Sequence, residues 1–341
     1  MNNSTFQPIH EIGFSELIKK LGAYKGTPRK EILEGIGDDA VIFSSESEYS
    51  FSASTEIFME GVHFDLTYHP LNHLGYKVVT AAVSDIYAMN TKPFQLLVSI
   101  AVPNMHSVEM VEKLYEGIDM ACKDYEIQIT GGDTTASHQL LAISVTAIGK
   151  GNKNQVIYRK GSTEGDLICV TGDFGAAMAG LRILMREKNE WREKGDLHFR
   201  PDLENYEYVI KRQLFPAARK DVIRLFEENN IIPSSLTDVT QGVVSAVSNL
   251  ANASSLGADI FLPAIPISLE TRKVADEMQE DVDKYAFYGG EDFELMFTLP
   301  ESKIKELEVL FDDFAVIGKM TDKKNILKID TGGEETIHIE I

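Results

Sequence analysis

Cysteine and tryptophan are scarce in this chain, which has two cysteines and one tryptophan in 341 residues. Cys122 falls on the apolar side of a predicted helix and Cys169 inside a predicted strand, so we expect two reduced core thiols and no disulfide. No apolar run is long enough to span a bilayer. The first residues show no basic segment followed by an apolar one, as a signal peptide would. Together these absences favour a cytoplasmic protein.

Basic residues are also in the minority. The chain has 33 lysines and arginines against 53 acids, which gives a formal net charge of −20. Such an excess disfavours nucleic acid and anionic membranes as partners. An anionic small molecule remains a possible substrate, provided that metal ions offset the local field.

Several signature motifs of nucleotide-dependent and hydrolytic enzymes are missing. The sequence has no Gly-x-x-x-x-Gly-Lys-Ser/Thr loop, no protein-kinase motif set and no Gly-x-Ser-x-Gly elbow. His63, His69 and His73 match no strong zinc-site spacing, and no cysteines join them. Gly-Ile-Gly-Asp-Asp-Ala at 35–40 partly fits the dinucleotide pattern, but the residues after it are not helical, as that pattern requires. An ATP enzyme built on this chain must therefore hold phosphates through metal ions, backbone amides and single basic residues.

The order of predicted elements indicates a mixed α+β or α/β protein in two domains. The length exceeds what one hydrophobic core usually serves, and strands and helices alternate loosely without repeats. Hydrophilic residues at 149–154 favour domains of 1–149 and 150–341. Helices are expected at about 10–21, 72–90, 107–125, 175–185, 204–213, 216–229 and 242–256, and strands at 49–54, 95–102, 127–130, 140–148, 166–170, 236–239, 259–262 and 293–299.

Two further segments of the second half, 186–203 and Gly172–Gly175, carry predictions of their own. Residues 186–203 are charged and have no clear period, so we expect a surface excursion there. Gly172–Gly175 opens a helix, where free amides attract anions, and is a candidate phosphate site. An ordinary helix-opening turn explains it equally well.

Acidic residues stand at the edges of several apolar runs, where an unpaired charge should be rare. They are Asp38, Asp39, Asp85, Asp133 and Asp238. Adjacent carboxylates repel each other and are costly to desolvate, unless a hard cation such as Mg²⁺ takes up their charge. We expect these segments to converge on one metal–phosphate site.

The predicted helix at 72–90 sharpens this expectation. At about 100° per residue, Asp85 falls inside the apolar arc of that helix, while Lys77, Thr80 and Ser84 lie on the opposite side. An acid on a buried arc has either a partner or a function. Arg159, after an apolar stretch, is a candidate basic clamp, with a plain surface arginine as the alternative.

Six short motifs occur in one order along the chain. They are Gly-Ile-Gly-Asp-Asp-Ala at 35–40, Ser-Thr-Glu at 54–56 with Gly-Val-His-Phe at 61–64, Ser-Asp-Ile at 84–86 with Ala-Met at 88–89, Gly-Gly-Asp-Thr at 131–134, Val-Thr-Gly at 170–172 and Gly-Gly-Glu-Asp-Phe-Glu-Leu at 289–295. The series resembles the thiamine-monophosphate kinase family, of the aminoimidazole ribonucleotide synthetase superfamily, over about residues 10–320. The resemblance implies an N-terminal domain that pairs across a homodimer and a C-terminal α/β domain. The apolar strands at 95–102 and 140–148, which one small domain would not fully cover, also favour the homodimer. It also implies phosphorylation of thiamine phosphate to thiamine diphosphate, with ATP as co-substrate and several Mg²⁺ ions.

The resemblance also assigns roles to individual residues. Those that resemble metal ligands are Asp39, Asp85, Asp133 and Asp238, with Ser54, Thr55 and Glu56 beside them; Asp39, Asp85 and Asp133 would also serve catalysis. His63 and Glu291 resemble substrate contacts. Gly132, Arg159 and Thr240 resemble nucleotide contacts.

Three departures from the family pattern bear on activity and not on fold. Glu56 stands where the family usually has aspartate. Gln241 replaces an acid, and Ala246 stands where an acid is common. The chain also ends without the aromatic element that the family usually carries near thiamine. Two other functions therefore stay open: a diverged relative that binds nucleotide or phosphate with weak or no kinase activity, and an ATP-using ligase of the same superfamily acting on another phosphorylated metabolite.

Overall fold

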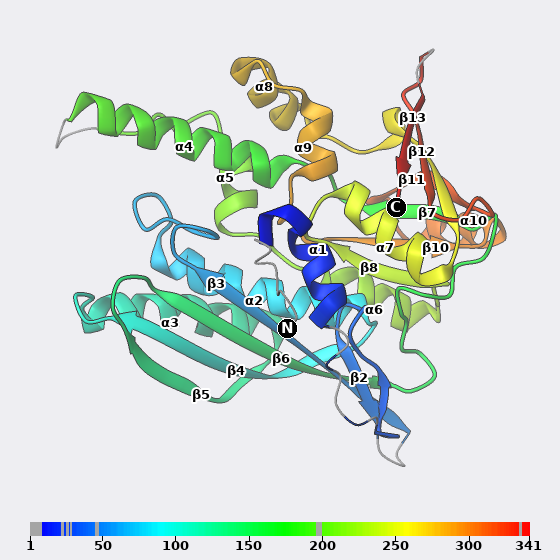
Figure 1. Ribbon diagram of the computed structural model, residues 1–341, viewed down its shortest axis with the longest axis horizontal. Coiled ribbons are helices and arrows are strands. Elements are labelled where there is room, and N and C mark those ends of the chain that lie inside the picture. The colour runs from blue at the N-terminus through cyan, green and yellow to red at the C-terminus, as the bar shows by residue number, and fades with distance from the viewer. Residues whose placement is uncertain are drawn as a thin grey trace, which may run out of the picture.

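Two β-sheets with helices packed on them make up the fold (Figure 1). The computed structural model describes residues 9–21, 24, 27, 29–44, 48–195, 200–333 and 336–341. The first sheet has the strand order β1–β2–β3–β6–β4–β5. Its strands are β1 (Ile32–Glu34), β2 (Val41–Ser44), β3 (Tyr49–Met59), β4 (Lys92–Pro103), β5 (Gln128–Ser137) and β6 (Ala142–Asn152). Neighbouring strands are antiparallel except β4 and β5, which run parallel.

Two helices, α2 (Leu71–Ala88) and α3 (Val108–Tyr125), cover one face of this sheet. They pack closely because glycines stand at their crossing. A Cβ on Gly75 would lie 2.0 Å from the carbonyl oxygen of Leu114, and one on Gly117 would lie 1.8 Å from that of Asn72. Any larger side chain at either position would force the helices apart.

The opposite face of the sheet, which we call the open face, is not covered by the described residues. Strand β6 alternates between buried side chains toward the helices and half-buried ones toward the open face. Apolar residues lie on this face, and Ile57 is 57% and Phe94 42% exposed. Phe51 stacks with Phe43 at 5.8 Å between ring centroids and meets Phe94 at 6.3 Å. Exposed apolar side chains on an uncovered sheet face are a feature of interaction sites.

The second sheet has seven strands in the order β13–β12–β9–β11–β7–β10–β8, all antiparallel except the pair β9 and β12. Its strands are β7 (Leu167–Thr171), β8 (Ser235–Val239), β9 (Gly257–Phe261), β10 (Glu294–Leu299), β11 (Phe314–Thr321), β12 (Ile326–Asp330) and β13 (Thr336–Glu340). The helices of this part are α4 (Ala176–Lys194), α5 (Glu207–Leu214), α6 (Lys220–Asn229), α7 (Val243–Ser254), α8 (Leu269–Met278), α9 (Val282–Tyr288) and α10 (Glu301–Leu310), with a 3₁₀ turn at Leu262–Ala264. We refer to the first sheet with α2 and α3 as the N-terminal half, and to residues 167–341 as the C-terminal half.

Helix α2 is buried on both sides. Its apolar side packs on the first sheet, and its polar side, which the sequence places opposite, packs against the C-terminal half. Lys77 donates to the carbonyl oxygen of Gln213 at 2.9 Å, and Thr80 donates to that of Pro216 at 3.2 Å. Ser84 donates to Asp238 Oδ2 at 2.6 Å. The polar side of α2 is therefore the seam between the two halves.

Most predicted elements of the main chain are present, with some differences. The expected surface excursion at 186–203 is wrong in its first part, because α4 continues to Lys194. Ion pairs within that helix support the extension, as between Lys194 and Glu190 at 2.7 Å. Helix α6 begins at Lys220 and not at the predicted 216, and α1 (Ile9–Leu21) is broken at Gly13, whose φ is 74°. Strands β1 and β2 and helices α8 and α9 were not expected.

Both cysteines are free and buried, as predicted. None of the helices in the described part of the chain combines the length and the apolar character that crossing a bilayer requires. The predicted domain limits of 1–149 and 150–341 stay a prediction, although the two sheets share no strand.

Candidate functional site

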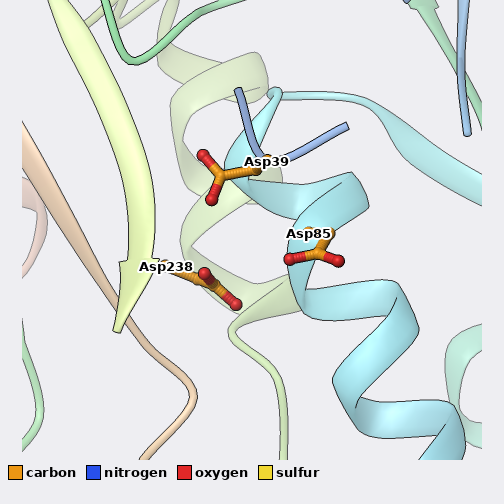
Figure 2. Close-up of side chains that lie close together, drawn as sticks. All are labelled: Asp39, Asp85 and Asp238. Atoms are coloured by element: carbon orange, nitrogen blue, oxygen red, sulfur yellow. The ribbon is translucent and has the colours of Figure 1, made fainter. Parts of the chain in front are cut away.

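Three aspartates from distant parts of the chain meet between the two halves (Figure 2). Asp39 precedes β2, Asp85 lies on α2, and Asp238 lies near the end of β8. One carboxylate oxygen of each lies within 4.8 Å of one from each of the others. We call these three residues the acidic cluster. The predicted convergence therefore holds for three of the acids that the sequence singles out.

The electrostatics of the acidic cluster are unfavourable without a cation. Burial raises the pKa of Asp39, and burial followed by the charge of Asp39 raises the pKa of Asp238 to about 7. Burial and the charges of Asp238, Glu56 and Asp39 raise the pKa of Asp85 well above its usual value. Such mutual repulsion is the arrangement that a divalent cation relieves.

Hydrogen bonds fix the orientation of each carboxylate in the acidic cluster. Arg159 donates two hydrogen bonds to the Asp39 carboxylate, from Nε at 3.0 Å and from Nη2 at 2.5 Å. Thr237 donates to Asp39 at 3.0 Å, Ser84 donates to Asp238, and the Ser54 hydroxyl donates to Asp85. The alternative of a plain surface arginine is wrong, since the Arg159 side chain is 21% exposed and ion-paired.

The neighbours of Ser54 divide between the two faces of β3. Glu56 shares the side of Ser54; burial raises its pKa, and a hydrogen bond with Asp85 opposes that rise. The longer Glu56 side chain therefore still reaches the acidic cluster. Thr55 points to the open face, where it bonds Thr146 at 2.9 Å. The expected place of the Thr55 side chain beside the metal ligands is not found within this chain, because successive residues of a strand face opposite sides.

Gly132 and Asp133 lie on β5, at the edge of the first sheet, with β4 and β6 between them and β3. Asp133 is exposed and accepts a bond from the amide of Thr134 at 2.9 Å. A Cβ on Gly132 would lie 1.7 Å from the carbonyl oxygen of Val98, and the φ of Gly132 is 151°. This glycine therefore lets β5 pack against β4. The structure does not bring Gly132 or Asp133 to the acidic cluster of the same chain.

A cavity of about 680 Å³ gathers the remaining predicted residues, and we call it the α4 pocket. His63, Thr240 and Glu291 line it together, so the predicted substrate contacts share a cavity with one predicted nucleotide contact. Its other lining residues are Gly61, Val62, Phe64, Asp65, Tyr68, Met178, Leu181, Met185, Lys188, Asn189, Arg192, Gln213, Gln241, Tyr288, Gly289 and Gly290. The volume falls within the range of small-molecule sites.

The candidate phosphate site at Gly172–Gly175 is wrong, because a carboxylate of the chain itself fills it. Asp292 Oδ2 accepts from the amide of Gly175 at 2.9 Å, and Oδ1 accepts from that of Ala177 at 3.3 Å. These amides stand at the start of α4, where a negative charge is favourable. Burial raises the pKa of Asp292 to about 7. No spacing pattern predicts this contact, which joins residues more than a hundred positions apart.

The departures from the family pattern have distinct surroundings. Gln241 lines the α4 pocket and accepts a bond from Ser245 Oγ at 3.5 Å. Ala246 is 3% exposed within the apolar core of the C-terminal half. The last strand, β13, ends at the edge of the second sheet, where Ile339 packs against the same core. Aromatic residues reach the α4 pocket from elsewhere, through Tyr68 and Tyr288.

Comparisons with known proteins agree with this architecture. The family models described as AIR synthase related protein match with their N-terminal domain over residues 37–150 and their C-terminal domain over 163–330. The thiamine-monophosphate kinase of Bacillus subtilis (strain 168) is 31% identical over 306 residues, which cover 87% of this chain and 89% of the relative. The chain belongs to the thiamine-monophosphate kinase family of AIR synthase related proteins.

Other members of the thiamine-monophosphate kinase family match over similar lengths. The enzyme of Aquifex aeolicus (strain VF5) is 29% identical over 319 residues, covering 93% of this chain and 94% of the relative. A solved structure described as "AaThiL complexed with AMPPCP and TMP" superposes with a TM-score of 0.82 at 27% identity and covers 96% of each chain. The expected fold class, an α/β N-terminal domain followed by an α/β C-terminal domain of the synthetase type, is thereby confirmed.

Proposed function

We propose that this protein transfers the γ-phosphoryl group of ATP to the phosphate of thiamine phosphate and so makes thiamine diphosphate. The observation that carries the proposal is the acidic cluster beside the α4 pocket, on a framework shared with thiamine-monophosphate kinases over nearly the whole chain. The acceptor is already a phosphate oxygen, so a strong general base is not needed. The main obstacle is repulsion between two polyanions.

The acidic cluster fits Mg²⁺, which prefers oxygen ligands and carboxylates above all. Asp39, Asp85 and Asp238 would hold the ion, with Glu56 and Ser54 completing the surroundings of Asp85. When bound, Mg²⁺ would supply positive charge that offsets the repulsion between the two phosphate-bearing substrates.

The protein groups around the acidic cluster act by holding it in place. Arg159, Thr237 and Ser84 fix the carboxylates before any ligand arrives, which reduces the reorganisation needed during the reaction. Arg159 stays a proposed nucleotide contact. Because it also bonds Asp39, it would then lie between the nucleotide and the metal ion. His63 and Glu291 would face the acceptor from the walls of the α4 pocket, and Thr240, a proposed nucleotide contact, lines the same pocket.

The decisive experiment supplies purified protein with Mg-ATP and thiamine phosphate and measures thiamine diphosphate by chromatography. We expect one product per ATP consumed, and loss of turnover when EDTA replaces Mg²⁺. Aminoimidazole-type and other phosphorylated metabolites serve as competing acceptors. ATP consumption with one of them and not with thiamine phosphate would support the ligase alternative, and tight ATP binding without any product would support the diverged binding protein.

We also propose a homodimer formed through the open face. Ile57 and Phe94 are exposed on it, and Phe51 meets Phe94 there, in a chain whose sheet is otherwise covered by helices. A face of this kind is stabilised by a second copy, most simply around a two-fold axis. The proposed metal and nucleotide roles of Thr55, Gly132 and Asp133 depend on this dimer, since these residues lie on the same sheet away from the acidic cluster of their own chain.

The dimer is tested by Ile57→Glu, which places a charge in the middle of the open face. We expect light scattering to give twice the chain mass for the wild type and the chain mass for the variant. The control is Ile232→Glu, at an exposed isoleucine of the C-terminal half, which should leave the mass unchanged. A wild-type protein of monomer mass at micromolar concentration would contradict the proposal.

A further inference from the structure

Lys77 is the largest side chain that α2 buries completely, with no exposed surface. Its ammonium group donates to Glu291 Oε2 at 2.8 Å and to the carbonyl oxygen of Gln213 at 2.9 Å. The side-chain amide of Gln213 is satisfied when its nitrogen donates to the carbonyl oxygen of Ala177 at 3.1 Å. In that orientation its oxygen also accepts from Lys77 Nζ at 3.2 Å. All three ammonium protons then have an acceptor, so Lys77 has none left for a ligand.

The partner of this lysine faces the α4 pocket. Glu291 is 30% exposed and lines the pocket beside Gln213, whereas Lys77 lies behind both of them. The backbone of Glu291 has a φ of 61°, a conformation uncommon for a residue with a side chain, and its amide donates to the carbonyl oxygen of Thr240 at 3.1 Å. The Glu291 carboxylate is thus held from behind by the lysine and presented to the cavity.

The same helix carries the acidic cluster. Asp85 follows Lys77 by eight residues on α2, which corresponds to about 12 Å along the helix axis. A rigid helix therefore separates a metal-binding end from an end that anchors the pocket wall. The acceptor phosphate must approach the acidic cluster while the rest of the acceptor occupies the pocket, so this spacing suits an elongated molecule.

We propose that Lys77 is a positioning residue for acceptor binding, acting through Glu291. The ammonium group holds one oxygen of Glu291 and leaves the other directed at the α4 pocket. That oxygen would take the amino group or the cationic ring of the acceptor. This inference rests on the proposed function, in which thiamine phosphate supplies a positively charged thiazolium ring and an aminopyrimidine.

Stability alone is a poor explanation for this lysine. Burying an ammonium group carries a large desolvation penalty, which pairing with a carboxylate offsets only in part. An apolar side chain of similar length would fill the same space without that penalty. Thr80, one turn along the seam, offers a matched comparison. It bonds the carbonyl oxygen of Pro216 across the seam and Tyr125 on α3, without touching Glu291.

The test compares steady-state kinetics of the wild type, Lys77→Met, Glu291→Gln, the double variant and Thr80→Val. We expect Lys77→Met and Glu291→Gln each to raise KM for thiamine phosphate by about 10- to 100-fold, the scale of one charge-assisted contact. KM for ATP should change little. In the Glu291→Gln background, Lys77→Met should add almost nothing, because the lysine acts only through that carboxylate. Thr80→Val should lower the melting temperature and leave both KM values unchanged.

Three results would overturn the inference. One is a Lys77→Met protein that melts lower but keeps its KM for thiamine phosphate, as a purely structural residue would. A second is full additivity of the two substitutions. A third is an unchanged KM in Glu291→Gln. If Lys77→Met does not fold, Lys77→Gln keeps a donor to Gln213 and is judged by the same KM values. A wild-type protein that neither binds nor phosphorylates thiamine phosphate would remove the proposed function first, and this inference with it.

Discussion

The carboxylate of Asp85 shows how a single residue of this site can oppose stability and serve function. We predict that Asp85→Asn lowers turnover at least 100-fold, because one anionic ligand of the acidic cluster is lost. The same substitution should leave the metal-free protein as stable as the wild type or more so, because it removes a desolvated charge that its neighbours repel. Magnesium-dependent turnover and thermal melting in EDTA measure the two effects.

Asp133→Asn is the matched control for the melting measurement alone, since Asp133 is exposed and outside the acidic cluster of its own chain. Its melting temperature in EDTA should stay within about a degree of the wild type, as for most surface changes. A clear loss of stability in Asp85→Asn, with normal magnesium dependence, would make Asp85 a structural residue and remove it from the proposed ligands.

Gln241 offers a gain-of-function test at the same scale. It lines the α4 pocket three residues beyond Asp238, with a neutral amide that cannot offset a cation's charge. We predict that Gln241→Asp lowers the magnesium concentration for half-maximal turnover, by an amount equivalent to about 1–3 kcal/mol of binding. Gln241→Glu is a control for side-chain length. An unchanged magnesium response would place Gln241 outside the metal site, and lower activity at saturating magnesium would indicate that its amide recognises the acceptor.

Individual site residues were predictable where a charge interrupts an apolar pattern, as at Asp39, Asp85 and Asp238. Motif similarity placed both Ser54 and Thr55 beside the metal ligands. In the structure only Ser54 reaches the acidic cluster, because successive residues of a strand face opposite sides. Lys77 could not be found in this way. A lysine opposite the apolar arc of a helix normally reaches water. Here the C-terminal half packs on that side of α2 and buries Lys77, and the local sequence pattern carries no information about that packing.

At the scale of elements, the start of α4 depends on Asp292. We predict that Asp292→Ala lowers the free energy of unfolding by about 2–4 kcal/mol, because two helix amides lose a charged acceptor and Arg212 loses a buried partner 3.8 Å away. It should also raise KM for thiamine phosphate, since Met178, Met185 and other α4 residues line the pocket. Urea unfolding and steady-state kinetics measure both.

Asp281→Ala provides the control, because Asp281 caps α9 by accepting from the amide of Asp283 at 3.0 Å at an exposed site. Loss of that cap should cost about 1 kcal/mol without changing KM. Equal effects of the two substitutions on stability and on KM would mean that Asp292 has no special connection to the pocket.

Element boundaries were predicted well where hydrophobic periodicity is strong, as in α2 and α3, and less well where charge hides it. Helix α4 continues past Met185 because ion pairs and the buried Glu187 take over from apolar contacts; Glu187 pairs with Arg186 and accepts from the amide of Asp202. The anion site predicted at the start of α4 failed for a related reason. The sequence around a helix start does not show which distant side chain will accept hydrogen bonds from its backbone amides.

For the whole molecule, buried carboxylates make stability depend on pH in an unusual direction. The folded state raises the pKa of Asp38 to about 6 and those of Asp238 and Asp292 to about 7, mainly by burial. Between about pH 4 and pH 7 the folded protein therefore holds protons that the unfolded chain releases. The stability of the metal-free protein must fall as pH rises through this window.

We predict a melting temperature in EDTA that is several degrees lower at pH 8 than at pH 5.5. Magnesium should raise it more at pH 8, because the ion binds the deprotonated carboxylates. Asp238→Asn is the control, with a weaker pH dependence and a smaller response to magnesium. A melting temperature in EDTA that rises from pH 5.5 to pH 8 would contradict the assigned burial of these charges.

At this scale the sequence predicted two halves, a mixed α/β class and the order of most strands. Apolar strands at 95–102 and 140–148 already indicated a sheet that one small domain would not fully cover, and with the family resemblance they led to the expected homodimer. The sequence could not show which face stays open, because the apolar residues of a half-buried strand look the same whether the cover is a helix or another chain. The exposed Ile57 and Phe94 are the reason to propose the open face as the dimer surface.

Helix α2 has a consequence for how this chain can change over evolutionary time. Apart from the limits on single residues such as Gly75 and Asp85, the length of this helix is itself constrained. An insertion of one residue between Lys77 and Asp85 would rotate one end by about 100° against the other and lengthen the helix by about 1.5 Å. Lys77 would then lose its contact with Glu291, or Asp85 would leave the acidic cluster. An insertion of four residues would come within about 40° of the original phase, yet it would move the two ends about 6 Å apart. Relatives that keep the chemistry should therefore vary freely in their loops and show no gaps inside this helix.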